Sequence, residues 1–124
     1  MKKTEIIKKN YEFKYFFKKG KFFSGKFLEV FVFENNNIKN KLGIVVSKKV
    51  GGSVTRNHIK RYIREAYTSI ENEVDSNLNI LIMWNKKVNP ELATFFETKN
   101  DLTNILKKAG KIKEIKWKKF LFFY

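Results

Sequence analysis

Residues 42–67 read LGIVVSKKVGGSVTRNHIKRYIREAY, and this stretch holds both a candidate buried strand and a candidate basic helix. The apolar and largely β-branched run over residues 42–47 favours a strand. Two glycines at 51 and 52 then interrupt the chain before a helix that we expect to begin near Val54 or Thr55. A strand, a turn and a helix in this order make a mixed α and β fold the first expectation.

The predicted helix has two distinct faces when its residues are placed about 100° apart. The apolar side chains share one arc, which we expect to be buried: Ile59, Tyr62, Ile63, Ala66 and Ile70. The neighbouring arc is cationic and polar: Arg56, Asn57, Lys60, Arg61 and Arg64. All the arginines of the chain lie on this arc, and residues 35–64 contain no Asp or Glu. Because guanidinium groups bind phosphate as planar forks, this face is predicted to bind a polyanion.

The start of this helix is also cationic, since Lys48 and Lys49 lie just before the glycines. A helix N-terminus carries partial positive charge, so cations there are unfavourable until an anion binds. A phosphate bound at this end would accept hydrogen bonds from backbone N–H groups and arginine together. The single histidine of the chain, His58, lies in the same stretch.

Composition narrows the class of protein. A chain of 124 residues with 43% hydrophobic residues is long enough for one folded domain, and its net charge of +15 favours a nucleic-acid partner. With no cysteine and one histidine, thiolate and multi-histidine metal sites are excluded. The first ten residues lack the apolar run of a signal peptide, and no apolar run reaches the roughly 18 residues of a membrane span. We expect a cytoplasmic protein without a membrane partner.

The remaining segments predict a helix over residues 10–19, strands over 27–33 and 78–84, and an asparagine turn at 35–37. A short additional strand is expected around Phe22 and Phe23. Alternation in the first strand puts Leu28, Val30 and Val32 on one face, and Phe27, Glu29, Phe31 and Phe33 on the other. A last helix, capped by Asn89 and Pro90 and ended by Gly110, has an apolar stripe: Leu92, Phe95, Phe96, Leu102, Ile105, Leu106 and Ala109. The order α-β-β-α-β-α predicts a single-domain α+β fold over residues 1–124.

Residues 42–67 closely resemble the protein subunit of bacterial ribonuclease P. The shared features are a strand ending in Ser-Lys-Lys, a glycine turn, then Arg-Asn, Ile-Lys-Arg and Arg-Glu at fixed spacing. Asn10, Phe13, Phe17 and Gly20 resemble the family's residues ahead of its first strands. The chain departs from the family at His58, where an arginine is usual, and the family pattern is not found in the basic and aromatic tail, residues 110–124.

The resemblance implies an α+β sandwich with a left-handed βαβ crossover, similar to one domain of a ribosomal protein. It implies a protein that assists a catalytic RNA in removing the 5′ leader of precursor tRNA, with Mg²⁺ held by the RNA and no catalytic residue in this chain. The expected contacts with the catalytic RNA are Lys48, Lys49, Arg56, Asn57, Lys60, Arg61 and Arg64. The leader is expected in a cleft between the first helix and the sheet, against Phe13, Lys14, Phe17 and Phe31, since aromatic rings stack on any base.

Other classes of protein share part of this pattern. A ribosomal or general RNA-binding protein would have the same size and charge without a role in cleavage. A stand-alone nuclease would need a carboxylate cluster or a histidine-based acid–base pair, but the acids lie mostly outside the basic region. A DNA-binding helix-turn-helix would need two adjacent helices where residues 42–47 predict a strand, so no DNA partner is expected. The tail at 110–124 is compatible with an RNA contact or with a strand that covers the core.

Overall fold

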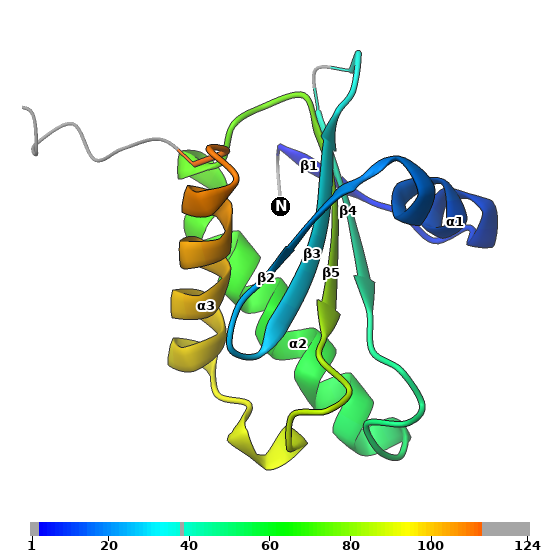
Figure 1. Ribbon diagram of the computed structural model, residues 1–124, viewed down its shortest axis with the longest axis vertical. Coiled ribbons are helices and arrows are strands. Elements are labelled where there is room, and N and C mark those ends of the chain that lie inside the picture. Colours follow the sequence, from blue (N-terminus) through cyan, green and yellow to red (C-terminus); the bar gives the residue numbers. More distant parts are fainter. Residues whose placement is uncertain (1–2, 38, 113–124) are drawn as a thin grey trace, which may run out of the picture.

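The computed structural model describes residues 3–37 and 39–112, which form a mixed five-stranded sheet with helices on both faces (Figure 1). The elements are β1 (Thr4–Ile6), α1 (Asn10–Lys19), β2 (Lys21–Ser24), β3 (Leu28–Glu34), β4 (Asn40–Val45), α2 (Ser53–Ile70), β5 (Leu78–Trp84) and α3 (Phe95–Lys108). Short 3₁₀ helices span Glu71–Glu73 and Pro90–Leu92. The α+β prediction is therefore confirmed.

The strands lie in the order β1-β4-β5-β3-β2. β4 is parallel to both β1 and β5, and α2 is the connection between β4 and β5. β3 is antiparallel to β5 and to β2. The short strand expected around Phe22 is β2, whereas the predicted order omits β1. Three residues are too few to give a periodic signal, and β1 is formed by its pairing with β4.

The main core lies between the sheet and the helices α2 and α3, which share one side of the sheet in Figure 1. The predicted alternation in β3 is confirmed, because Leu28, Val30 and Val32 are buried in this core. Phe27 departs from it: this residue precedes β3 and its ring stacks on Trp84. On α2 the buried residues are as predicted except that Tyr67 is buried, while Tyr62 is only partly covered.

The opposite face of the sheet is covered by α1, which lies apart from α2 and α3 in Figure 1. Phe16 is the buried residue of α1 and packs with Ile7 and Leu81. Partly buried hydrophobic side chains pack against this contact: Phe13, Phe31, Phe33, Val45 and Met83. One short helix on a broad sheet face leaves aromatic side chains accessible on both of its flanks.

The last predicted helix is two elements in the structure. Asn89 accepts a hydrogen bond from the backbone N–H of Glu91 and caps the short Pro90–Leu92 helix, and a second cap at Thr94 then begins α3. The predicted stripe was consequently wrong at its start, since Leu92 is 52% exposed and Phe96 74% exposed. Gly110 follows α3 with a φ of 69°, which confirms the predicted end of the helix.

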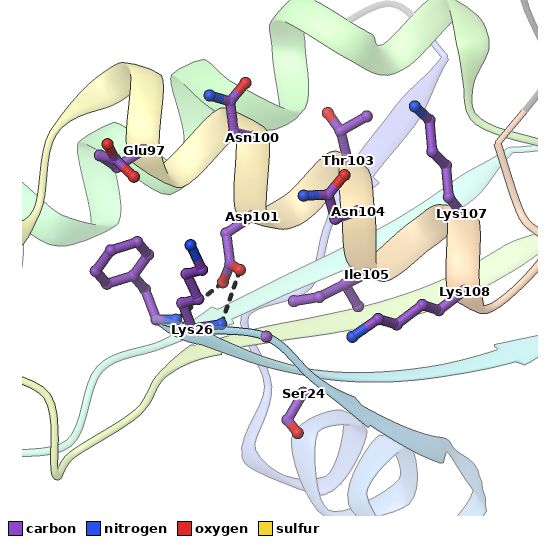
Figure 2. A pocket seen from close by; sticks show the side chains of 12 residues that line it. Ser24, Lys26, Glu97, Asn100, Asp101, Thr103, Asn104, Ile105, Lys107 and Lys108 are labelled. Carbon is purple, nitrogen blue, oxygen red and sulfur yellow. Dashed lines mark hydrogen bonds between the residues drawn. The ribbon is translucent and has the colours of Figure 1, made fainter.

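Asp101 of α3 holds the turn between β2 and β3. Its carboxylate accepts hydrogen bonds from the backbone N–H groups of Lys26, Phe27 and Leu28 at 2.8, 3.0 and 2.9 Å. Figure 2 shows this carboxylate beside Lys26 at the turn. A side chain at Gly25 would collide with this carboxylate, so the turn requires glycine. Beside this contact is an open depression of about 830 Å³ between the turn and α3.

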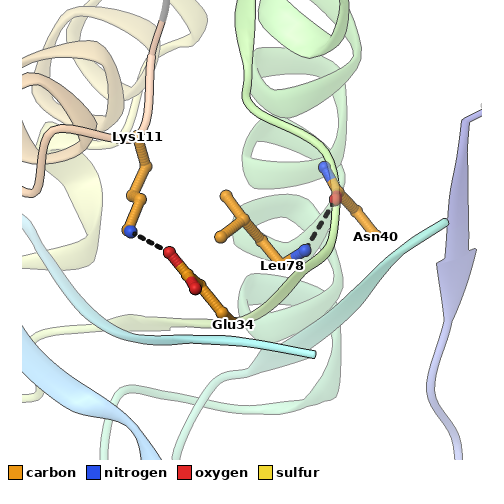
Figure 3. Close-up of polar contacts among 4 residues, drawn as sticks. All are labelled: Glu34, Asn40, Leu78 and Lys111. Atoms are coloured by element: carbon orange, nitrogen blue, oxygen red, sulfur yellow. Dashed lines mark hydrogen bonds and ion pairs between the residues drawn. The ribbon is translucent and has the colours of Figure 1, made fainter. Parts of the chain in front are cut away.

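Asn40 joins the starts of β4 and β5. Its side-chain oxygen accepts the backbone N–H of Leu78 at 2.9 Å (Figure 3). Its side-chain amide N–H group donates to the backbone oxygen of Asp75 and to the Tyr67 hydroxyl. Tyr67 also shares a 2.8 Å hydrogen bond with Thr4 of β1. Burial raises the pKa of the Tyr67 phenol above its ordinary value. This network fixes the short β1 strand to α2.

Candidate RNA interface

The cationic face of α2 consists of side chains that are exposed or only partly covered. Asn57, Arg61 and Arg64 are exposed, and Arg56 and Lys60 are partly covered. Arg61 lies 3.8 Å from Glu65 in an exposed ion pair, a type of contact that adds little stability. Within residues 3–37 and 39–112, no carboxylate lies within 4.0 Å of the cationic groups of Arg56, Lys60 or Arg64. The positive charges of this row are therefore not paired with a carboxylate in the described part of the chain.

The N-terminus of α2 has no acidic residue in its first turn and no side-chain cap, because Gly52 occupies the capping position. The preceding turn, residues 47–50, presents Lys48 and Lys49 to solvent. Near this end, the Nε atom of Arg56 is buried and makes no hydrogen bond with any residue in the described part of the chain. Free backbone donors and cations thus meet at one helix end, as in phosphate sites.

On the other face of the sheet, three phenylalanines from three elements form an aromatic surface, which we call the phenylalanine surface: Phe17 of α1, Phe22 of β2 and Phe31 of β3. The Phe31 ring centroid lies 5.1 Å from that of Phe17 and 5.1 Å from that of Phe22. Phe17 is 40% exposed and Phe22 45% exposed. These rings are stabilised by one another yet keep area that a base can cover.

The phenylalanine surface depends on the close approach of α1 to β3. Gly20 follows α1, and a Cβ atom placed there would lie 2.7 Å from both the Phe16 carbonyl oxygen and the Phe31 Cβ. Any side chain at Gly20 would push the end of α1 away from the strand. Phe13, also predicted for this site, is partly buried on the same sheet face, and Lys14 of α1 is exposed.

A family model described as Ribonuclease P matches residues 1–110. The chain belongs to the ribonuclease P protein family. The ribonuclease P protein component of Clostridium novyi is 38% identical over 112 residues, covering 89% of this chain and 97% of that protein. The protein component of Clostridium kluyveri is 41% identical over 106 residues, covering 84% and 93%. This chain is thus a protein component of ribonuclease P, with a function in tRNA 5′ processing as part of an endoribonuclease complex.

Solved structures of this family share the fold. The Staphylococcus aureus RNase P protein superposes with a TM-score of 0.76 at 31% identity, covering 87% of this chain and 97% of that one. The Thermotoga maritima RNase P protein superposes with a TM-score of 0.75 at 28% identity, covering 84% and 96%. The predicted resemblance is confirmed in sequence and in fold.

The structure groups the predicted site residues into two sets on opposite faces of the sheet. The cationic set lies on and before α2, and Phe13, Phe17 and Phe31 lie with α1. The prediction missed Phe22, although its register opposite Phe31 follows from a tight hairpin between β2 and β3. His58 is on neither set: it lines a separate depression of about 350 Å³ with Asn89 and Glu91.

Across residues 3–37 and 39–112, no three His, Cys, Asp or Glu side chains gather closely enough to hold a metal ion. No helix in the same part of the chain is long and apolar enough to cross a membrane. The predicted tail contact falls largely on residues 113–124, which lie outside the described residues.

Proposed function

We propose that this protein binds the catalytic RNA of ribonuclease P through α2 and the 5′ leader of precursor tRNA through the phenylalanine surface. The observation that carries the proposal is the row of Arg56, Lys60 and Arg64, which has no carboxylate partner among the described residues. Such a row destabilises an isolated helix, because like charges four residues apart repel. Phosphates of a folded RNA would reverse that cost.

The cationic contact with the catalytic RNA consists of Lys48, Lys49, Arg56, Asn57, Lys60, Arg61 and Arg64. Arg61 is already oriented, since its guanidinium lies 5.5 Å from the Tyr62 ring centroid. Contacts of this kind bind the phosphate backbone irrespective of sequence, which gives them a strong dependence on salt.

The leader contact must tolerate different sequences, since each tRNA gene supplies its own leader. Stacking on Phe17, Phe22 and Phe31 meets this need, because every base has a π-face. Phe13 supports the same face from α1, and the exposed Lys14 of the same helix supplies a cation for the leader phosphates. The cationic set thus contacts the catalytic RNA, and the phenylalanine surface contacts the substrate.

We propose further that the catalytic RNA, with its Mg²⁺ ions, performs the hydrolysis. Several acids of this chain have structural partners: Asp101 accepts three backbone hydrogen bonds, and Glu12, Glu34 and Glu65 each pair with a cation. A general RNA-binding role without cleavage, the alternative open from sequence, is not favoured by the family assignment.

Reconstitution tests this function. The protein is mixed with a bacterial ribonuclease P RNA at a magnesium concentration too low for the RNA alone, and cleavage of precursor tRNA is measured. We expect the mixture to release the leader and the RNA-free protein to be inactive. Cleavage by the protein alone, or no stimulation of the RNA at any salt concentration, would contradict the proposal.

A further inference from the structure

The flank of α1 that faces away from the phenylalanine surface carries a second aromatic feature. An open depression of about 850 Å³ lies between α1 and the turn that joins β3 to β4. Its aromatic lining is Tyr11, Tyr15, Phe16 and Phe33, and we call it the tyrosine groove. The two flanks differ because Tyr11 and Tyr15 are one helical turn apart on one side of Phe16, while Phe13 and Phe17 are on the other.

The two tyrosines of this groove are far more exposed than the side chains of the core. Tyr11 is 66% exposed and Tyr15 48% exposed. The Tyr15 ring meets Phe33 edge-on, with centroids 5.4 Å apart, and Phe33 in turn meets the buried Phe16 at 5.4 Å. Phe33, which packs on the buried Phe16, thus orients Tyr15, and the exposed areas of Tyr11 and Tyr15 stay available to a ligand.

The charge around the groove favours an anionic ligand. Both acids in its lining are paired with lysine: Glu12 lies 3.9 Å from Lys41, and Glu34 lies 3.1 Å from Lys111. Lys19 also lines the groove, and the ammonium of Lys9 lies 5.8 Å from the Tyr11 ring centroid. Because both acids are paired, Lys9 and Lys19 leave the net charge around the groove positive. The net charge of the whole chain is +15.

The wall opposite the tyrosines supplies polar groups. Asn35 is engaged within the turn, donating to Asn79 at 2.7 Å and accepting from the backbone of Asn37. The side chains of Asn36 and Asn37 are exposed and line the same depression. Amide groups can donate to and accept from the edges of nucleobases, so this wall complements the aromatic one.

We propose that the tyrosine groove binds unpaired nucleotides of RNA, by stacking on Tyr11 and Tyr15 with phosphates near Lys9 and Lys19. The inference builds on the proposed function by adding a second single-stranded RNA contact on the far flank of α1. The nucleotides come either from the catalytic RNA or from a part of the leader beyond the phenylalanine surface, and the chemistry of the groove is the same for both.

The test uses the double variant Tyr11→Ala/Tyr15→Ala and a short, fluorescently labelled single-stranded RNA, titrated into the free protein across a range of salt concentrations. We expect at least about a fivefold loss of affinity, the lower end of what a lost stack costs. The salt slope should not change, because every lysine is retained. Phe96→Ala on α3 is the matched control: it removes a ring that is 74% exposed from the other face of the sheet and should leave affinity unchanged.

Two further titrations identify the source of the nucleotides. Weaker binding of the variant to the catalytic RNA alone assigns the groove to that RNA, and weaker binding of the reconstituted complex to precursor but not mature tRNA assigns it to the leader. Unchanged affinity for the short RNA, or no loss in either further titration, would overturn the proposal. The first titration needs no catalytic RNA, so failure of the reconstitution experiment would count against the proposed function and leave this result intact.

Discussion

The carboxylate of Asp101 accepts a hydrogen bond from the backbone N–H of Leu28 at 2.9 Å, so a residue of the last helix holds the first residue of β3. The same carboxylate accepts the N–H groups of Lys26 and Phe27. β3 also carries Phe31, so the position of the phenylalanine surface depends on a helix on the opposite face of the sheet.

Replacing Asp101 with Ala should destabilise the fold by about 3 kcal/mol, since three backbone donors lose a charged acceptor. Chemical unfolding of the variant and the parent measures this difference. Asn100→Ala is the control, because Asn100 is exposed on the same helix and beside the same depression. A loss no greater than that of Asn100→Ala would show that the three hydrogen bonds contribute little.

Tyr67 should make the fold sensitive to alkaline pH. Burial raises the pKa of its phenol in the folded state, so the neutral form contributes stability that is complete below about pH 10 and is lost as pH rises through the folded pKa. Tyr67→Phe should cost about 1–2 kcal/mol near neutral pH by removing the hydrogen bonds to Thr4 and Asn40. The variant's free energy of unfolding should fall less steeply above pH 10.

The measurement for Tyr67 is unfolding free energy as a function of pH, with Tyr62→Phe as a control for loss of a tyrosine hydroxyl on the same helix. Identical alkaline slopes for the parent and Tyr67→Phe would exclude Tyr67 as the group responsible.

Arg64→Ala should weaken binding to the catalytic RNA and lower the dependence of log affinity on log salt by about one phosphate contact. Arg64 is exposed, so the fold should be unaffected. Titration of the labelled RNA at several salt concentrations gives both quantities. Lys107→Ala removes an exposed cation from α3 for comparison. Equal slopes for the parent and Arg64→Ala, with the fold intact, would place Arg64 outside the interface.

The strongest patterns in the sequence predicted the elements that position the RNA contacts. The two faces of α2 follow from residue spacing alone, because burial of Ile59, Ile63, Ala66 and Ile70 leaves the arginines outward. The prediction failed where tertiary contacts decide. β1 exists through its pairing with β4, and Tyr67 is buried because Thr4 and Asn40 satisfy its hydroxyl.

The start of α3 was missed for a local reason. Asn89 and Pro90 do cap a helix, but it is only a short 3₁₀ turn, and Thr94 provides a second cap five residues later.

The aromatic sites show a different limit of prediction from sequence. Sequence alone identified candidate rings in α1 and β3, yet only the packing of Phe16 assigns Phe17 to one flank of α1 and Tyr15 to the other.

Exposed phenylalanines are proposed to bind the leader, and the variant Phe17→Ala is a direct test of this contact. Affinities of the reconstituted complex for precursor and mature tRNA are measured with thermal unfolding of the same variant, and Phe96→Ala serves as the control. Phe17 is 40% exposed, so we expect a small change in melting temperature, a loss of about 1–3 kcal/mol for precursor tRNA and almost none for mature tRNA. Equal losses for the two tRNAs, or a destabilisation of about 3–5 kcal/mol typical of a core phenylalanine, would rule out a leader contact at Phe17.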